Sequence, residues 1–552
     1  MLRKNSFVTL LFICILLLSK GTFLALSLPL STRSRWLVDA PTGKRVKLHC
    51  VNWVAHMETM LVEGLDRKPV GDIASGVVSL GFNCVRLTWA TFMFTRDGFL
   101  KLRVGESLEA NGLAEALINM AKHNPSMINL TLVQAYDEVV DALGVVGLMV
   151  VLDNHVSRPQ WCCGDDDGNG FFGDTHFDPE EWLQGLASVA QRFGSKSQVV
   201  GMSLRNELRG PLQSESNWYR YVELGAAKIH EANPNLLVIV SGLNYGTDLS
   251  FLKQKPLAVG EDLGNKLVYE AHWYAFSQGK RHQWEERSPN RVCANSISRF
   301  ENKVGFVSST APLFVSEFGV DQRGVNRADN RFLACFLAYA VSKDLDWALW
   351  ALQGSYYLRK GRPGFDETYG VLDTGWDHPR NPNFHQRFRL LHQMIKDPES
   401  NHSVNHILYH PLSGLCVQTI QDLENNDTAV VQVRDCESED SRSRWSFRGN
   451  GHGDPIWLTG TNLCLRHVGN RLPVILSREC SDWETKWRVL SSSRLQVQIA
   501  AMDTQGEFQC LEKSFSNASS LLFTRECLCL DDSFCEENPQ SQWFKRISTN
   551  VL

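Results

Sequence analysis

Short apolar segments alternate with longer amphipathic segments along roughly the first 400 residues of the chain. Stretches such as 132–144, 180–194 and 217–234 place apolar residues at steps of three and four, which predicts helices. Eight strands interleaved with helices predict an α/β fold, a closed (β/α)8 TIM barrel. The candidate strands are short, apolar and rich in β-branched or aromatic residues, as strands covered on both faces should be: 46–53, 83–89, 147–155, 199–207, 236–246, 266–274, 312–319 and 345–354.

Two further details bear on this fold prediction. Residues 35–48, RWLVDAPTGKRVKL, predict a hairpin that turns at Pro41, Thr42 and Gly43 and leads into the first barrel strand. An open, doubly wound sheet is the alternative to a closed barrel, because it also alternates strands with helices. No Gly-x-Gly-x-x-Gly motif follows the first strand, so the dinucleotide site that such sheets often carry is not indicated.

The pattern changes after residue 403. Helical periodicity ends, and short apolar pieces repeat in three units, each with two cysteines followed by a tryptophan. The units contain GLCVQ, RDCES and SRWSF; NLCLR, RECSD and TKWRV; and FQCLE, RECLCL and SQWFK. Repetition at roughly forty to fifty residues predicts an all-β array whose units pack on each other. We expect disulfides Cys416–Cys436 and Cys464–Cys480, and leave open the connectivity of the four cysteines in the third unit.

The first residues have the features of a secretory signal peptide. Arg3 and Lys4 precede an apolar run over residues 7–18 that is too short to span a bilayer, and the predicted leader ends at residue 27. No later stretch of the sequence is long and apolar enough for a membrane helix. Of fifteen cysteines, fourteen remain once Cys14 leaves with the leader, and this even number permits complete pairing in an oxidising compartment.

The mature chain is therefore expected to be secreted, or to stay in the lumen of the secretory pathway. Its net charge of −5, with acids and bases mixed along the chain, forms no basic stripe and speaks against nucleic-acid binding. Glycosylation would be possible in that compartment at four Asn-x-Ser/Thr sequons, which begin at Asn129, Asn401, Asn426 and Asn517.

Polar and aromatic residues gather where the predicted barrel strands end. Functional side chains of a parallel barrel collect at the carboxyl ends of its strands, so these residues should meet at one mouth. His272 and Tyr274 are two residues apart on one strand and face the same way, while Trp273 faces elsewhere. The full set is Arg86, His155, Asn206, Glu207, His272, Tyr274, Glu317 and Trp350.

Two carboxylates in this set suit the hydrolysis of a glycosidic bond. Glu207 ends the fourth predicted strand and Glu317 ends the seventh. One carboxylate can attack the anomeric carbon while the other, kept protonated, gives its proton to the leaving oxygen. If the two carboxyl groups lie about 5 Å apart, the reaction retains the anomeric configuration, because no water fits between them. This chemistry needs neither a cofactor nor a metal ion.

Three more residues fit supporting roles around the carboxylates. Arg86 can keep the nucleophile ionised by charge pairing, and Tyr274 can hydrogen-bond it. Asn206 can bind the sugar hydroxyl beside the reacting carbon. These side chains would therefore hold both the nucleophile and the reacting sugar.

Histidines and tryptophans complete the predicted site. His155 and His272 can orient sugar hydroxyls or the acid, and Trp350 can form a stacking floor. Trp161 is a candidate for an accessory platform, since exposed aromatic rings are the usual surfaces on which sugars stack. The predicted partner of the site is thus a carbohydrate.

An acidic insertion follows the third strand. Residues 165–176, DDDGNGFFGDTH, begin with the spacing of a calcium loop, but the twelfth position is His176, where such a loop needs a bidentate glutamate. We therefore interpret the insertion as an ordered substrate-side loop. Cys162 and Cys163 are expected to pin it through disulfides, with Cys293 as one candidate partner.

These motifs resemble the cellulase family of glycoside hydrolases, family 5, over about residues 35–396. The resemblance is carried by VRLTW, LDNH, RNE, AHWY, SEFG and LWALQG. It implies that Glu207 is the acid/base, that Glu317 is the nucleophile, and that the substrate is a glucan, a mannan or a related β-glycoside. One departure is Leu208, where the family commonly has proline; that position sets the direction of the loop and leaves the proton chemistry intact.

The C-terminal units resemble a ricin-type β-trefoil lectin, which implies a glycan ligand for this part of the chain. The Gln-x-Trp signature of those lectins reads SRW, TKW and SQW here, and no aspartate follows the first cysteine of each unit. The tryptophans are therefore equally explained as core residues. The expected domains are a signal peptide over 1–27, a glycosidase barrel over 28–398 and a lectin-like domain over 403–552.

The sequence favours a secreted retaining β-glycosidase with a lectin-like module. A transglycosylase is one alternative, because it would use the same two glutamates and pass the sugar to another acceptor. A catalytically silent glycan-binding protein is the second, but it would be expected to lack a catalytic carboxylate, and both Glu207 and Glu317 are present.

Overall fold

The computed structural model describes residues 29–260, 263–419, 429–447, 452–501, 506–513, 520–530, 535 and 537–551. The predicted signal peptide, Cys14 and the sequons at Asn426 and Asn517 lie outside these residues. The sequons at Asn129 and Asn401 are exposed, as glycosylation would require. Among the described helices, none has the length and apolar composition needed to cross a membrane.

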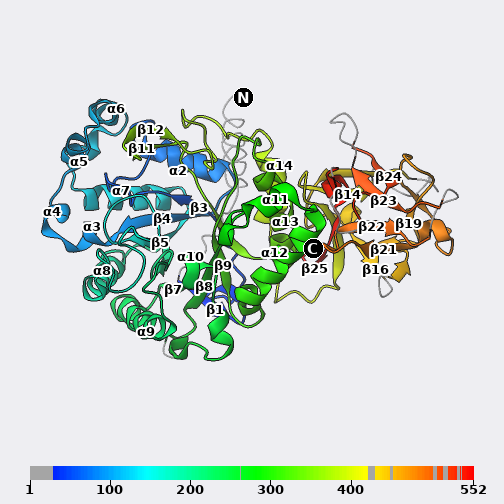
Figure 1. Ribbon diagram of the computed structural model, residues 1–552, viewed down its shortest axis with the longest axis horizontal. Helices are drawn as coiled ribbons and strands as arrows, with labels where there is room; N and C mark the ends of the chain where they lie inside the picture. Colours follow the sequence, from blue (N-terminus) through cyan, green and yellow to red (C-terminus); the bar gives the residue numbers. More distant parts are fainter. Residues whose placement is uncertain are drawn as a thin grey trace, which may run out of the picture.

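A closed barrel of parallel strands forms the larger part of the molecule (Figure 1). The chain order of the strands is also their order around the barrel, and the last strand pairs with the first. The strands are β3 (His49–Trp53), β4 (Cys84–Ala90), β5 (Met149–Val156), β6 (Val199–Ser203), β7 (Leu237–Ser241), β8 (Leu267–Trp273), β9 (Leu313–Phe318) and β10 (Asp346–Leu349). The predicted TIM barrel is confirmed, and the open-sheet alternative is excluded.

Helices cover the outside of the barrel, and polar caps fix where several of them begin. Thr131 and Gln134 form a capping box at the start of one helix, and Asp178 with Pro179 begins the next. The longer helices are α2 (Val70–Ser79), α6 (Ala114–His123), α7 (Leu132–Val145), α8 (Pro179–Arg192), α9 (Glu215–Ala232), α12 (Pro289–Lys303), α13 (Arg327–Lys343) and α14 (Phe384–His392). The shorter ones are α3 (Thr91–Thr95), α4 (Asp97–Leu100), α5 (Val104–Ala110), α10 (Leu243–Gly246) and α11 (Arg281–Glu286).

A hairpin near the N-terminus closes the amino end of the barrel. Strand β1 (Leu30–Arg33) pairs with β2 (Trp36–Asp39), and Leu30 and Leu37 pack into a cluster with the first residues of the barrel strands. The predicted turn after Asp39 is present, and a short pairing follows it: Val38 bridges Arg45, the Asp39 amide donates to the Lys44 carbonyl, and the Val46 amide donates to the Leu37 carbonyl. Because this end is plugged, the open mouth of the barrel lies at the carboxyl ends of its strands.

A second hairpin follows the last barrel strand at this mouth, formed by β11 (Ser355–Arg359) and β12 (Arg362–Asp366). The segment after α14 is a separate all-β region. Its strands are β13 (Asn405–His410), β14 (Leu415–Thr419), β15 (Val431–Asp435), β16 (Trp445–Phe447), β17 (His452–Asp454), β18 (Ile456–Leu458), β19 (Cys464–Arg466), β20 (Ile475–Ser477), β21 (Trp487–Leu490), β22 (Gln496–Ile499), β23 (Gln509–Lys513), β24 (Leu522–Glu526) and β25 (Lys545–Thr549). They form two antiparallel sheets around a core of their own.

Two of the repeated tryptophans use the same internal contact in this region. Trp445 and Trp487 are buried, and each indole N–H donates to the backbone carbonyl of the residue after the first cysteine of its unit, at 3.0 and 2.9 Å. These two side chains are therefore core residues, which was one of the two interpretations of the repeated tryptophans.

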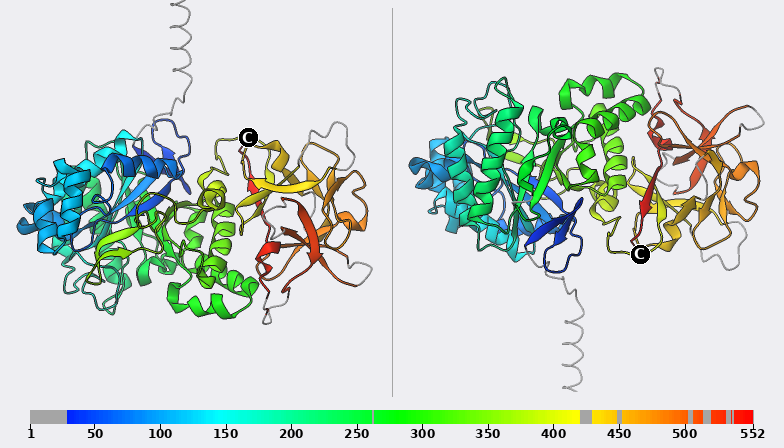
Figure 2. Two further views of the ribbon diagram at one scale, coloured as in Figure 1. Left: turned by 90° about the horizontal axis from the view of Figure 1, so that it is seen from above. Right: turned by 90° about the horizontal axis from the view of Figure 1, so that it is seen from below.

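The third tryptophan, Trp543, contacts the barrel instead. Its indole N–H donates to Oδ1 of Asn290 on α12 at 2.9 Å. Asn290 is fully buried and also bonds Gln496, Ser493 and the carbonyl of Cys529. Figures 1 and 2 show the all-β region lying beside α12 and α13. Asn290 is thus one of several contacts between the two parts; Gln540 also donates to the carbonyl of Arg331 on α13, and Gln393 donates to that of Cys436.

The disulfides confirm the predicted pairs in the first two C-terminal units and correct the prediction in the barrel. The third unit pairs Cys510 with Cys527 and Cys529 with Cys535. Cys293 does not reach the acidic insertion, because it lies on α12 and pairs with Cys335 on the adjacent helix α13. Cys162 and Cys163 pair with each other, and Cys50 pairs with Cys84; the confirmed bridges are Cys416–Cys436 and Cys464–Cys480.

Candidate active site

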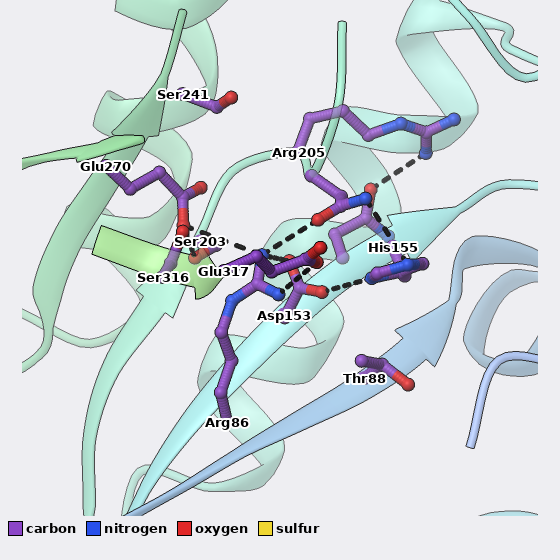
Figure 3. Close-up of polar contacts among 12 residues, drawn as sticks. Arg86, Thr88, Asp153, His155, Ser203, Arg205, Ser241, Glu270, Ser316 and Glu317 are labelled. Atoms are coloured by element: carbon purple, nitrogen blue, oxygen red, sulfur yellow. Dashed lines mark hydrogen bonds and ion pairs between the residues drawn. The ribbon is translucent and has the colours of Figure 1, made fainter. Parts of the chain in front are cut away.

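A buried guanidinium lies at the base of the barrel mouth (Figure 3). Arg86 forms ion pairs with Asp153 at 2.8 Å, with Glu270 at 3.5 Å and with Glu317 at 3.0 Å. Burial alone would lower the pKa of Arg86, but these three carboxylates raise it, so the side chain stays charged. Arg86 lies inside β4 and not at its end, and only its long side chain reaches the mouth.

Arg86 also fixes two amides. Its Nη1 donates to Oδ1 of Asn52 and its Nη2 donates to Oδ1 of Asn206, both at 2.9 Å. Because its carbonyl oxygen is held by Arg86, the Asn206 amide directs its NH2 group away from the guanidinium. That NH2 lies 3.3 Å from Nε2 of His155, whose Nδ1 is 2.6 Å from Asp153.

Glu317 is held by two donors. Nη1 of Arg86 donates to its Oε1 and the Tyr274 hydroxyl donates to its Oε2, both at 3.0 Å. Burial raises the pKa of Glu317 to about 7, against the opposing effect of His272 and Arg86. Both donors stabilise the ionised carboxylate, so this oxygen pair is suited to act as a nucleophile.

Glu207 occupies a different environment. Nδ1 of His272 lies 2.7 Å from its Oε1, and its backbone carbonyl accepts a hydrogen bond from Arg209 at 2.7 Å. Burial raises the pKa of Glu207 to about 7, although Arg209 and Arg86 oppose the shift. No positively charged side chain is paired directly with the Glu207 carboxyl among the described residues, which favours its protonated form over that of Glu317.

The two glutamates face each other across the barrel mouth. The parallel register of β8 and β9 pairs His272 with Glu317, and this register brings His272 between the two acids. One oxygen of Glu207, one ring nitrogen of His272 and one oxygen of Glu317 all lie within 4.8 Å of one another. Such a group could geometrically hold a metal ion, but the nearby Arg86 guanidinium would repel it, and Glu317 is already satisfied by hydrogen bonds.

A cleft of about 1070 Å³ opens over these residues. The Trp350 ring stacks on His155 with ring centres 5.5 Å apart and forms part of the cleft wall. Trp161 also lines the cleft and lies 3.4 Å from the Arg359 guanidinium, which comes from β11. Phe276 is 45% exposed at the cleft and stacks on Tyr274. Aromatic faces therefore flank the acids on several sides.

All eight predicted residues belong to one contact network. Seven of them line the cleft, and Arg86 lies beneath it. In the acidic insertion after β5, Asp167 accepts from two backbone amides and pairs with Arg209, and Asp174 accepts from the amide of Gly170. These bonds argue for an ordered loop and not for a calcium site.

Sequence reasoning missed several residues of the network. Asp153 and Glu270 each lie two residues before a predicted histidine on the same strand, so strand alternation could have identified both. His56, which stacks on His155 with ring centres 3.8 Å apart, and Arg209 follow their strands in loops, where no sequence periodicity applies.

Comparison with known proteins identifies the fold and the family. Residues 49–355 match the family described as cellulase (glycosyl hydrolase family 5). The chain belongs to glycosyl hydrolase family 5. A protein of Chamaecyparis obtusa described as a glycosyl hydrolase 5 family protein is 46% identical over 538 residues, which cover 95% of this chain and 94% of that protein. The similarity to this relative thus includes the all-β region.

More distant proteins share the barrel. The major extracellular endoglucanase of Xanthomonas campestris pv. campestris is 25% identical over 63% of this chain and 68% of its own length. The solved catalytic domain of that enzyme has a TM-score of 0.53 and 22% identity, covering 66% of this chain and 98% of the domain. An endocellulase of Pyrococcus horikoshii has a TM-score of 0.52 and 19% identity, covering the same 66% of this chain and 98% of its own. The protein is accordingly a glycosyl hydrolase.

Proposed function

We propose that this family 5 enzyme cleaves β-glycosidic bonds with retention of configuration, through a covalent intermediate on Glu317. The proposal is supported by one observation: the nearest approach of the two carboxyl groups, from one oxygen of Glu207 to one oxygen of Glu317, is within 4.8 Å. Retaining glycosidases place their two carboxyl groups about 5–5.5 Å apart, whereas inverting enzymes leave about 6.5–9.5 Å for a water molecule.

In the first step, the ionised Glu317 attacks the anomeric carbon. The bond to the leaving oxygen breaks, and that oxygen takes the proton of Glu207. Arg86 and Tyr274 favour the charged form of Glu317 before the attack. Asn206, whose NH2 faces the cleft side of the network, binds the hydroxyl next to the anomeric carbon.

In the second step, the Glu207 carboxylate removes a proton from water. The water oxygen attacks the anomeric carbon and releases Glu317. His272, at 2.7 Å from Glu207, holds the acid/base in place through both steps. A transglycosylase would differ only in using a sugar hydroxyl instead of water, and product analysis with and without an added acceptor sugar separates the two.

We propose a β-glucan, β-mannan or related β-glycoside as the substrate class. The distant relative from Xanthomonas campestris is described as an endoglucanase, and one solved endocellulase of Pyrococcus horikoshii is a complex with cellotetraose. The aromatic faces of Trp350, Trp161 and Phe276 supply stacking surfaces for several sugar rings. Hydrolysis rates on a panel of β-linked oligosaccharides and aryl glycosides would identify the preferred sugar.

A mechanism-based trap tests the roles of the glutamates. An activated 2-fluoro-β-glycoside should form a covalent adduct on Glu317, visible by mass spectrometry. Glu317→Ala should lower turnover by at least about 10³-fold and abolish the adduct. Glu207→Ala should slow substrates with poor leaving groups far more than activated ones, because only the former need its proton.

The control for this test is Glu109→Ala, which removes an exposed carboxylate on α5 and should leave turnover unchanged. Full activity in Glu317→Ala would overturn the role assignment. A folded wild-type protein that binds β-glycans but turns over none of the panel would instead support a silent glycan-binding protein.

We further propose that the chain acts outside the cell. Seven disulfides form among the described cysteines, which suits an oxidising compartment. Glycan binding by the all-β region, over the expected residues 403–552, stays a prediction from its lectin resemblance. Affinity electrophoresis of Glu317→Ala in gels with embedded polysaccharide would test that binding without turnover.

A further inference from the structure

Two adjacent cysteines form part of the wall of the active-site cleft. Cys162 and Cys163 are bonded to each other and both line the cleft beside Trp161. The other twelve described cysteines form six bridges elsewhere. The Cys162–Cys163 disulfide therefore lies at the active-site cleft and does not link helices on the outside of the barrel.

The disulfide contacts the residue that we assign to the sugar hydroxyl. The side-chain nitrogen of Asn206 lies 3.8 Å from the sulfur of Cys162 and 3.8 Å from that of Cys163. Disulfide sulfur can accept a weak hydrogen bond but cannot donate one. The two sulfurs are therefore compatible with the donor NH2 group of Asn206. Arg86 fixes the opposite end of the same amide.

The loop that carries the disulfide is also joined to the acid/base. Arg209 donates to the backbone carbonyl of Gly164 at 2.9 Å and to that of Glu207 at 2.7 Å. Its second Nη pairs with Asp167 in the same loop. The disulfide loop is thus connected to Asn206 through the sulfurs and to the backbone of Glu207 through Arg209.

We propose that the Cys162–Cys163 disulfide is a positioning and specificity element of the sugar site, which orients Asn206 and bounds the space around the hydroxyl at C2. This inference rests on the proposed role of Asn206 in binding that hydroxyl. A hydroxyl bonded to the Asn206 nitrogen at about 3 Å would also be in van der Waals contact with the sulfurs. The disulfide would therefore limit which substituents fit at C2.

Opening the bridge should disturb this arrangement. Exchange with dithiothreitol gives each cysteine one hydrogen and oxidises the reagent to its cyclic disulfide. The two sulfurs then separate from about 2 Å to van der Waals distance, about 3.5–4 Å. Each new thiol can also donate a hydrogen bond, which would compete with the NH2 group that it faces.

The test compares an aryl β-glucoside with its 2-deoxy analogue. In Cys162→Ala/Cys163→Ala, we expect kcat/KM for the glucoside to fall about tenfold while that for the 2-deoxy analogue changes less than twofold, because only the glucoside uses Asn206. In an Asn206→Ala background, the same double substitution should cause no further change in the ratio. A general loss of structure would lower both substrates equally and act in both backgrounds.

Two controls keep the outcome decisive. Dithiothreitol should change the wild-type ratio in the same direction and leave the ratio of Cys162→Ala/Cys163→Ala unchanged; an equal effect on both proteins would attribute the change to another bridge and overturn the proposal. Cys162→Ser/Cys163→Ser replaces the alanine variant if that one fails to fold. A substrate ratio within twofold of wild type in the folded variant would also overturn the proposal.

A structural readout separates this inference from the proposed function. Crystal structures grown with and without dithiothreitol should differ in the orientation of the Asn206 amide, whether or not the protein hydrolyses the test glycosides. An unchanged amide beside a reduced cysteine pair would refute the positioning role. Absence of turnover or of a Glu317 adduct in the wild type would refute the proposed function alone.

Discussion

Substitution Tyr274→Phe isolates one of the two hydrogen bonds that favour the charged form of Glu317. The Tyr274 hydroxyl donates to Oε2 of Glu317 at 3.0 Å, and its ring stacks on Phe276 with ring centres 4.6 Å apart. Phenylalanine keeps the ring and its stacking partner and removes only the hydroxyl. The remaining donor to Glu317 is then Arg86.

The expected effect follows from the strength of a hydrogen bond to a charged group. Such a bond contributes about 1.5–3 kcal/mol, and each pKa unit corresponds to about 1.4 kcal/mol. The bond favours the ionised form, so its loss should raise the pKa of Glu317 from about 7 by about 1–2 units. Catalysis needs the ionised form, so activity should be lost at a higher pH as the solution is acidified.

The assay is the pH dependence of kcat/KM, which reports the free enzyme. A dinitrophenyl β-glycoside is the suitable substrate, because its leaving group needs no proton from Glu207 and the acidic limb then reports Glu317. At pH 6 we expect kcat/KM to fall about 10–100-fold, with recovery toward the wild-type value in alkaline solution.

The matched control is Tyr339→Phe. Tyr339 is also buried and its hydroxyl donates to a glutamate, Glu301, at 2.9 Å, but neither residue lines the cleft. This variant should lose stability without moving the acidic limb. An acidic limb of folded Tyr274→Phe within about 0.3 units of wild type would refute the assignment of Glu317 as the group that must be ionised.

Two substitutions away from the cleft test what holds the fold together. Although burial alone would raise the pKa of Asp344, ion pairs with Lys47 and Arg45 lower it well below its usual value. Asp344→Asn should lower the free energy of unfolding by about 3–5 kcal/mol, measured with urea at pH 7. This difference between wild type and variant should shrink as the pH falls below about 4, because Asp344 of the folded wild type then becomes protonated less readily than that of the unfolded chain. An unchanged difference at acid pH would contradict the ion-pair account. Asn290→Ala should cost about 2–4 kcal/mol and separate the unfolding of the all-β region from that of the barrel in calorimetry, because Trp543 loses its acceptor. A single unshifted transition would show that Asn290 does not couple the two parts.

The strands and the residues at their ends were predictable because both follow from short periodicities. A strand buried on both faces is apolar over four to eight residues, and its functional side chains can only be at the mouth. Glu207, His272 and Glu317 were found in this way. The hairpin over residues 35–48 was predicted at its turn and in the short pairing beyond it. The longer pairing with Leu30–Arg33 was not predicted, since these residues lie upstream of the segment that carried the signal.

Features that depend on contacts between distant loops were not predictable. The even number of cysteines allowed Cys293 as a partner for Cys162 or Cys163. Pairing also requires proximity, and it is the packing of α12 against α13 that brings Cys293 next to Cys335. Arg209 has no strand periodicity to mark it, although it bonds both the acidic insertion and the backbone of Glu207. The shape of the cleft depends on these loops, and with it the choice of substrate.

The roles that we propose for the two glutamates follow from the groups around each carboxyl and not from a difference in pKa, because burial raises the pKa of both to about 7. Two acids within 4.8 Å of each other disfavour simultaneous ionisation, so between their two titration steps the pair holds one proton. Of the two glutamates, Arg86 donates only to Glu317. Among the described residues, the carboxyl of Glu207 is bonded to His272, whose own pKa is lowered by burial. The shared proton is therefore most stable on Glu207, as its proposed role of acid/base requires. Because both residues are glutamates, their proposed roles could be reversed only by exchanging the groups that surround them.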